Sequence, residues 1–97
     1  MRLTFTPLAE QDLEAIGDYI AADNPLRALR FVRELRAQCQ RITINPPGYR
    51  LRTELGDGIR SCAYGHYVIF FEAEPDAVVI LRILHGARDL PAVFGAG

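Results

Sequence analysis

The feature that most constrains the fold is the sequence VVILRIL at residues 78–84, which is apolar at nearly every position. A strand with apolar side chains on both faces must be covered on both faces, so we expect it to lie inside a sheet. Arg82 is the single charged residue in this run. The run stops at His85, and Arg88 and Asp89 follow soon afterwards. The sequence therefore predicts a polar edge where the most buried strand ends.

Two helices are predicted in the first half of the chain, after a short strand. Residues 2–5 alternate polar and apolar, and Thr6-Pro7 then supplies a helix N-cap and a proline at the first helical position. The apolar residues of this first helix recur at steps of three and four, at Ala9, Leu13, Ile16 and Ile20. Asn24-Pro25 repeats the start signal, and we expect the second helix from Pro25 to about Ile42. Its core stripe consists of Ala28, Phe31, Val32, Leu35, Cys39 and Ile42.

Four strands are predicted in the second half. Asn45-Pro46-Pro47-Gly48 ends the helix, and period-two patterns then predict strands at 49–55, 59–64, 67–72 and 78–84, joined by short turns. The predicted class is α+β, with a short N-terminal strand and an antiparallel helical hairpin packed on an antiparallel β-sheet, in the order βααββββ. We expect one domain over residues 1–97, because this length is typical of a single hydrophobic core.

Charge and residue usage exclude several classes of function. The net charge is only −1, which argues against a protein built around nucleic-acid phosphates or an anionic membrane. Every basic residue is arginine, so a lysine general base or Schiff base is excluded. Cys39 and Cys62 lack the spacing of a zinc site or a disulfide framework, and we interpret them as core thiols in a reducing compartment. Without a visible signal peptide or membrane span, we expect a soluble cytoplasmic protein.

Arginine is concentrated on the side of the second helix that faces away from its core stripe. These residues are Arg27, Arg30, Arg33, Arg36 and Arg41. The pattern fits a solvated helix face and a binding surface equally well, so both interpretations stay open.

The element order and several motifs resemble the RelE/ParE toxin superfamily, and specifically its ParE branch. The motifs are Thr6-Pro7-Leu8-Ala9, Asp12-Leu13 to Tyr19-Ile20, Arg60 before YGHYVIFFE at 64–72, and RILHGARD at 82–89. The resemblance covers nearly the whole chain. Members of this superfamily are toxins of bacterial type II toxin–antitoxin pairs, and the flexible C-terminal segment of a small antitoxin masks each one. The resemblance implies a growth-arresting bacterial toxin with a ParD-like antitoxin as its partner.

Two activities divide that superfamily: RelE-like members cleave messenger RNA in the ribosome, and ParE-like members inhibit DNA gyrase. Cleavage needs a general base, cations for the phosphate and an acid for the leaving oxygen. RelE-like proteins supply lysines, arginines and a tyrosine or histidine near the C-terminus. This chain has no lysine, and the apolar residues 90–94 stand where a tyrosine is expected. We therefore expect a gyrase inhibitor with no catalytic residues. Two alternatives stay open: mRNA cleavage by Arg60, Arg82, His85 and Arg88, and a non-toxic homologue that only binds an antitoxin.

The candidates for contact with the target lie on the predicted sheet and at its C-terminal end. They are Arg60, Arg82, His85, Arg88 and Asp89. Each also has a structural interpretation: Arg82 can pair with Asp89 or Glu72, His85 can bond backbone at the strand end, and Arg88 with Asp89 can form an exposed ion pair. Gly86 is expected to turn the chain with a positive φ.

For the antitoxin we expect a segment that folds on binding and buries apolar surface against the helical hairpin. Its acidic residues are expected to meet a set of arginines, namely Arg27, Arg30, Arg33, Arg50 and Arg52. We expect no metal site, no cofactor, no membrane partner and no direct sequence-specific contact with nucleic acid.

Overall fold

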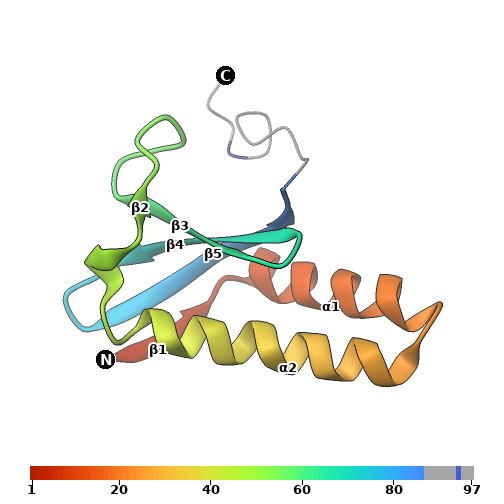
Figure 1. Cartoon of the computed structure of the whole chain (residues 1–97). Helices are drawn as coiled ribbons and strands as arrows, with labels where there is room; N and C mark the ends of the chain where they lie inside the picture. Colours follow the sequence, from red (N-terminus) through yellow and green to blue (C-terminus); the bar gives the residue numbers. More distant parts are fainter. Residues whose placement is uncertain (87–93, 95–97) are drawn as a thin grey trace.

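The computed structural model describes residues 1–86 and Phe94, and within them the chain forms two α-helices and a five-stranded sheet (Figure 1). In chain order the elements are β1 (Arg2–Phe5), α1 (Pro7–Ala21), α2 (Pro25–Ile42), the 3-10 helix η1 (Pro46–Gly48), β2 (Arg50–Leu51), β3 (Ile59–Tyr64), β4 (Tyr67–Ala73) and β5 (Ala77–His85). The α+β class and the order βααββββ are confirmed. None of the helices in this part of the chain is long and apolar enough to span a membrane.

Both helix starts form as predicted. The Thr6 side chain accepts a hydrogen bond from the Ala9 N–H at 3.0 Å, and the Asn24 side chain accepts one from the Arg27 N–H at 3.1 Å. A proline follows each cap at the start of the helix, where its missing N–H costs nothing. The helix boundaries are therefore encoded locally.

The strands lie in the order β1-β5-β4-β3-β2, so β5 is an interior strand as predicted. Strands β2 to β5 form an antiparallel meander. β1 departs from the antiparallel expectation, because it pairs with β5 in parallel, with Arg2 opposite Ala77 and Phe5 opposite Ile80. The helical hairpin lies between β1 and the meander in sequence and lets β1 join the sheet in this direction.

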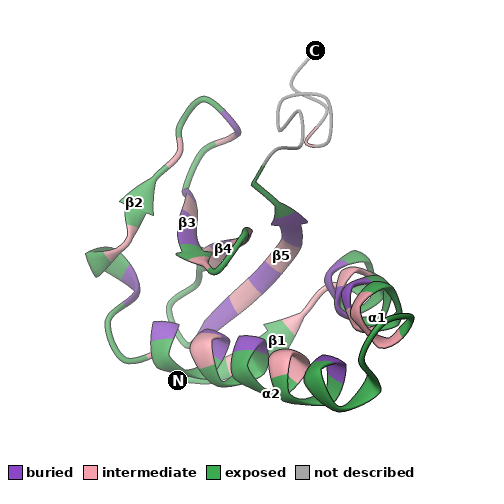
Figure 2. Ribbon diagram, turned by 45° about the vertical axis from the view of Figure 1, so that its right-hand side comes forward, coloured by how far each residue is buried: buried purple, intermediate pink, exposed green. Residues whose placement is uncertain are grey.

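The core has two parts, one on each face of the sheet. Between the sheet and the two helices lies a cluster that includes Leu13, Leu35, Phe71 and Ile80 (Figure 2). On the other face a smaller cluster joins four buried residues, Leu55, Ile59, Phe70 and Leu84, and Phe94 packs edge-on against Phe70 at 5.1 Å between ring centroids. β5 contributes to both clusters, which explains why its sequence is apolar on both faces.

The prediction that the two cysteines are core thiols is confirmed. Cys39 of α2 and Cys62 of β3 are both buried, unbridged and part of the cluster under the helices. Burial raises the pKa of the Cys39 thiol to about 12, and it also raises the pKa of Cys62. Both groups therefore remain neutral thiols near pH 7.

An irregularity in β5 positions the first helix. The β4–β5 register shifts between Phe70 and Phe71, which pair with Arg82 and Ile80, so Leu81 is the additional residue of a β-bulge. At this level β1 has ended, and Thr6 replaces it. The Thr6 N–H donates to the Ile80 carbonyl at 3.0 Å, and the Thr6 hydroxyl donates to the Leu81 carbonyl at 2.8 Å. The N-cap residue of α1 is thereby attached to the bulge.

Six residues after Thr6, Asp12 of α1 continues the same attachment. Its Oδ2 accepts from the Ile83 N–H at 2.9 Å and from Arg82 Nε at 2.8 Å, and its Oδ1 accepts from Arg82 Nη2 at 2.9 Å. The side chains of Asp12 and Arg82 are only 13% and 19% exposed. The charged partner of Arg82 is therefore on α1, not Glu72 or Asp89 as expected, and Asp89 lies outside the described residues.

Two local predictions are wrong. The strand expected at 49–55 is limited to Arg50–Leu51, because the chain then turns, with the Leu55 N–H donating to the Arg52 carbonyl at 3.0 Å, and buries Leu55. Gly86 does not have a positive φ. Its N–H donates to the His66 carbonyl at 2.9 Å, so Gly86 is still attached to the β3–β4 turn just after β5 ends.

We expect Asp12→Asn to lower the free energy of unfolding by about 2 kcal/mol, since it leaves the partly buried Arg82 guanidinium without its counter-charge. The matched control is Glu10→Gln, which removes the carboxylate of an exposed ion pair with Arg36 at 3.0 Å and should cost between about 0 and 1 kcal/mol. Urea unfolding of both variants measures the difference. Equal losses in the two variants would show that the Asp12–Arg82 contact is not a main attachment of α1.

Candidate functional site

A hollow of about 920 Å³ lies where the turn between the helices meets the end of β5, and we call it the tip hollow. The C-terminal end of α1, the N-terminal end of α2, the β3–β4 turn and the last residue of β5 each contribute to its wall. Its lining residues are Tyr19, Ile20, Asp23, Asn24, Arg27, Phe31, Gly65, His66, Tyr67 and His85. Its size is within the range of sites for small ligands or for side chains of a partner.

The β3–β4 turn brings two histidines together in this hollow. Gly65 has φ +58°, which permits a two-residue connection between the strands. His66 then lies beside the end of β5, where its ring stacks on that of His85 at 6.2 Å between centroids and 17° between planes. Tyr67 meets His85 edge-on at 5.5 Å. Rings from three different strand ends thus form one wall.

Phe31 of α2 joins the rings of the sheet to the helical hairpin. Its ring centroid lies 5.6 Å from that of Tyr67 and 6.0 Å from that of Tyr64. Burial is the main cause of the raised pKa of Tyr67, and the nearby Tyr19 adds to it. Tyr19 itself is 79% exposed at the rim. An exposed aromatic ring beside a ring-lined hollow is a common feature of binding surfaces.

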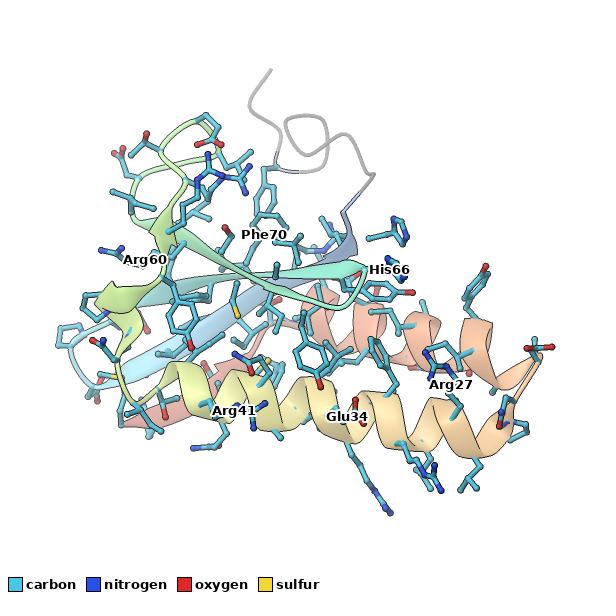
Figure 3. All side chains as sticks on the ribbon, viewed as in Figure 1. Arg27, Glu34, Arg41, Arg60, His66 and Phe70 are labelled. Atoms are coloured by element: carbon cyan, nitrogen blue, oxygen red, sulfur yellow. The ribbon has the colours of Figure 1, made fainter. Side chains whose placement is uncertain are left out.

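Charged groups lie around the rings. Asp23 in the turn between the helices and Arg27 in the first turn of α2 both line the hollow. Figure 3 shows Arg27 and His66 at the same end of the molecule. The described part of the chain contains no group of three or more His, Cys, Asp or Glu that could hold a metal ion. Guanidinium and imidazole groups beside aromatic rings are suited to recognition of anionic and aromatic groups.

The predicted target-contact residues are not gathered at one place. His85 lies in the tip hollow, and Arg88 and Asp89 lie outside the described residues. Arg82 is bound to Asp12 on the β1 side of the sheet. Arg60 donates from Nη1 to the carbonyls of Tyr49 at 2.8 Å and Pro47 at 3.5 Å, and Figure 3 shows it far from His66. Of the described candidates, His85 alone faces the hollow.

The arginines expected to meet an antitoxin fall into two groups. Arg27, Arg30 and Arg33 are exposed along the first half of α2, and Arg50 is exposed on β2. Arg52 is engaged by its neighbours: its Nε donates to Glu54 Oε2 at 2.7 Å and its guanidinium lies 5.8 Å from the centre of the Phe70 ring. Solvent therefore reaches the α2 arginines, whereas the side chain of Arg52 is 16% exposed.

All lining residues of the hollow except Arg27 and His85 were missed from the sequence, including four that contribute aromatic rings: Tyr19, Phe31, His66 and Tyr67. Three of them were assigned only to a helix, a core stripe or a strand. His66 had a detectable signal, because a two-residue turn at 65–66 places it between the paired residues Tyr64 and Tyr67, and Tyr67 in turn lies opposite His85 in the observed register. Nothing in the sequence indicated that Tyr19 and Phe31 line the hollow, because their place there depends on how the helical hairpin packs on the sheet.

Comparison with known protein families finds a family model that matches most of the chain. The family described as "ParE toxin of type II toxin-antitoxin system, parDE" matches residues 3–90. No curated protein matches the sequence.

Two solved structures are similar over most of the chain. One is from the chromosomal ParDE toxin–antitoxin system of P. aeruginosa, with a TM-score of 0.73 and 26% identity over 88% of this chain and 95% of that one. The other is from the toxin–antitoxin complex RelBE2 of Mycobacterium tuberculosis, with a TM-score of 0.64 and 25% identity over 87% and 95%. With the family match over residues 3–90, these likenesses show that the chain belongs to the ParE toxin family of type II toxin–antitoxin systems.

Proposed function

We propose that this toxin inhibits DNA gyrase without catalysing a reaction, and that a ParD-like antitoxin neutralises it. The family match over residues 3–90 is the observation that carries the proposal, because it names the ParE toxin rather than the nuclease branch. The resemblance in the motifs at residues 6–20 and 82–89 supports the same assignment. Inhibition by binding requires a shaped surface and no proton transfer.

The roles of the sheet arginines support binding over catalysis. RNA cleavage needs cations that are available to a phosphate in the transition state. The Arg82 guanidinium is already bound to both carboxylate oxygens of Asp12, and Arg60 is bound to backbone carbonyls. The chain has no lysine that could replace them. Both arginines therefore serve as positioning residues for the fold.

Messenger RNA cleavage is the second candidate. The similarity to a chain of the RelBE2 complex favours it, and a pair of imidazoles at His66 and His85 is suited to moving a proton. The lack of lysine and the internal contacts of Arg60 and Arg82 weigh against it. A non-toxic homologue that only binds an antitoxin is the third outcome that the experiments below distinguish.

We place the contact with the target at the tip hollow and at the residues that follow His85 in the sequence. His85 is exposed at the point where β5 ends, and Arg88 and Asp89 follow in the sequence outside the described residues. We place the antitoxin on the arginines of α2. An acidic segment lying along Arg27, Arg30 and Arg33 gains charge-assisted hydrogen bonds from side chains that solvent reaches. Arg50 of β2 is also exposed and is a second candidate contact, whereas Arg52 is bound to Glu54.

Induction of the full chain in a bacterial host should stop DNA synthesis before protein synthesis. Incorporation of labelled thymidine and of labelled methionine is followed in the same culture over the first minutes, and supercoiling by purified gyrase is then assayed with the purified toxin. An early collapse of translation with unaffected gyrase would support mRNA cleavage instead. If neither synthesis changes, the chain is a non-toxic antitoxin binder.

His85→Ala should preserve the fold and weaken growth arrest at least about tenfold, as expected when one well-packed contact of a recognition surface is lost. Glu74→Ala, in the β4–β5 turn and exposed, is the matched control and should remain fully toxic. Toxicity is read as the inducer concentration that halves growth, and circular dichroism monitors folding. Full toxicity of both His85→Ala and Arg88→Ala variants would remove the target contact from this end of the sheet.

Charge reversal on α2 tests the antitoxin surface. The double variant Arg30→Glu/Arg33→Glu should bind the antitoxin at least about 100-fold more weakly, because attraction becomes repulsion at two exposed positions. The double variant Arg2→Glu/Arg41→Glu carries the same change of net charge at other exposed positions and should bind nearly normally. Isothermal titration at two salt concentrations measures both. Unchanged affinity of the first variant would place the antitoxin elsewhere.

A further inference from the structure

A second concave surface lies between the two helices, and we call it the hairpin groove. It has a volume of about 550 Å³ and is lined by residues of both helices, including Glu14, Gly17 and Asp18 of α1 and Leu29 and Val32 of α2. It shares no lining residue with the tip hollow among the described residues. Because Arg27 and Phe31 line the hollow whereas Leu29 and Arg36 line the groove, the two concave surfaces use different sides of α2.

The two walls of the hairpin groove carry opposite charge. On α1, Glu10, Glu14 and Asp18 are exposed at intervals of four residues and form one acidic row. On α2, Arg36 lines the groove, and Arg33, three residues before it, is an exposed neighbour on the helix surface. Among the described residues, one ion pair crosses the groove. It joins Glu10 to Arg36 at 3.0 Å.

Apolar side chains lie between and beyond the charged rows. Leu29 is 51% exposed on the α2 wall, and Leu26 on the same helix is 58% exposed. The floor is formed by small or partly covered residues: Gly17, Ala28 and Val32. Leu29 in the groove wall and the exposed Leu26 on the same helix favour a partner that covers them.

Contacts within the chain fix the height of each charged residue, that is, its position along the axis of the helical hairpin. Glu10 pairs with Arg36, and a Cβ on Gly17 would lie 3.3 Å from a methyl of Val32. In two antiparallel helices these contacts place Glu14 at the height of Arg33, and Asp18 near Leu29. Acidic and basic side chains thus stand at matching heights on the two walls.

We propose that the hairpin groove is a self-association surface, at which a second copy of this chain docks its own hairpin. A two-fold axis parallel to the helices places α1 of one copy against α2 of the other at equal heights. Glu14 of each copy then faces Arg33 of the other, and the leucines of both copies are covered between the rows. The contact between Glu14 and Arg33 therefore forms twice, as every contact does in an isologous interface.

Charge complementarity favours a second copy as the occupant. An occupant must present a basic group to Glu14, an acidic group to Arg33, and apolar groups beside them. A second hairpin presents such a pair, its own Arg33 and Glu14, at matching heights, with Leu29 beside them. In such a dimer the tip hollow stays open, because it is lined from the other side of α2.

Sedimentation equilibrium of the full-length toxin, purified free of antitoxin, tests the proposal between about 0.01 and 1 mM. The wild type should show a monomer–dimer equilibrium. Glu14→Arg and Arg33→Glu should each weaken it at least about tenfold, and the double variant Glu14→Arg/Arg33→Glu should restore it, since attraction returns with the signs exchanged. Leu29→Ser should also weaken the dimer, and neither charge reversal should restore it. Arg41→Glu, an exposed arginine outside the groove, is the matched control and should leave it unchanged.

Each result decides for or against the self-association surface. Recovery in the double variant, with unchanged circular dichroism, supports it. A toxin that is monomeric at every concentration overturns it, and so does a dimer that the charge reversals leave unaffected. If the toxin is monomeric and Glu14→Arg instead weakens antitoxin binding, the groove is an antitoxin site. Gyrase inhibition and antitoxin affinity are separate readouts, so failure here leaves the proposed function standing.

Discussion

The carboxylate of Asp12 is the contact on which the arrangement of the molecule depends. It binds the Ile83 N–H and the Arg82 guanidinium at the level where β1 has ended and the β5 edge would otherwise lack a partner. Thr6 performs the same task six residues earlier, at the bulge. A helix side chain thus replaces a missing strand, and the cost of burying a charge is offset by satisfying three donors with one residue.

This attachment determines where the helical hairpin ends. With α1 fixed to β5 near its start, its C-terminal end extends to the β3–β4 turn, and Phe31 of α2 meets Tyr64 and Tyr67 there. The stacked pair of His66 and His85 completes the tip hollow. The same hairpin leaves the hairpin groove on its other side, with acidic α1 opposite basic α2. One pair of helices therefore offers two separate surfaces for recognition.

The arginines of the described chain fall into two groups according to what their guanidinium groups contact. Arg60, Arg82 and Arg52 are bound by backbone carbonyls or carboxylates of their own chain, whereas Arg27, Arg30 and Arg33 extend from α2 into solvent. A guanidinium that is already paired holds elements together, and one that solvent reaches is available to a partner. Membership of the ParE toxin family and the proposed inhibition by binding are both consistent with that division.

Local sequence determined the helix caps at Thr6 and Asn24, strand β3, and the interior position of β5, because each follows from capping chemistry or from the period of apolar residues. Only the tertiary structure decided the parallel pairing of β1, the brevity of β2, the Asp12–Arg82 pair and the ring cluster of the tip hollow. Those features join residues as much as 75 positions apart, as Arg2 and Ala77 are. Periodicity reports which face of an element is buried, but the partner that covers it is selected by packing of the whole chain.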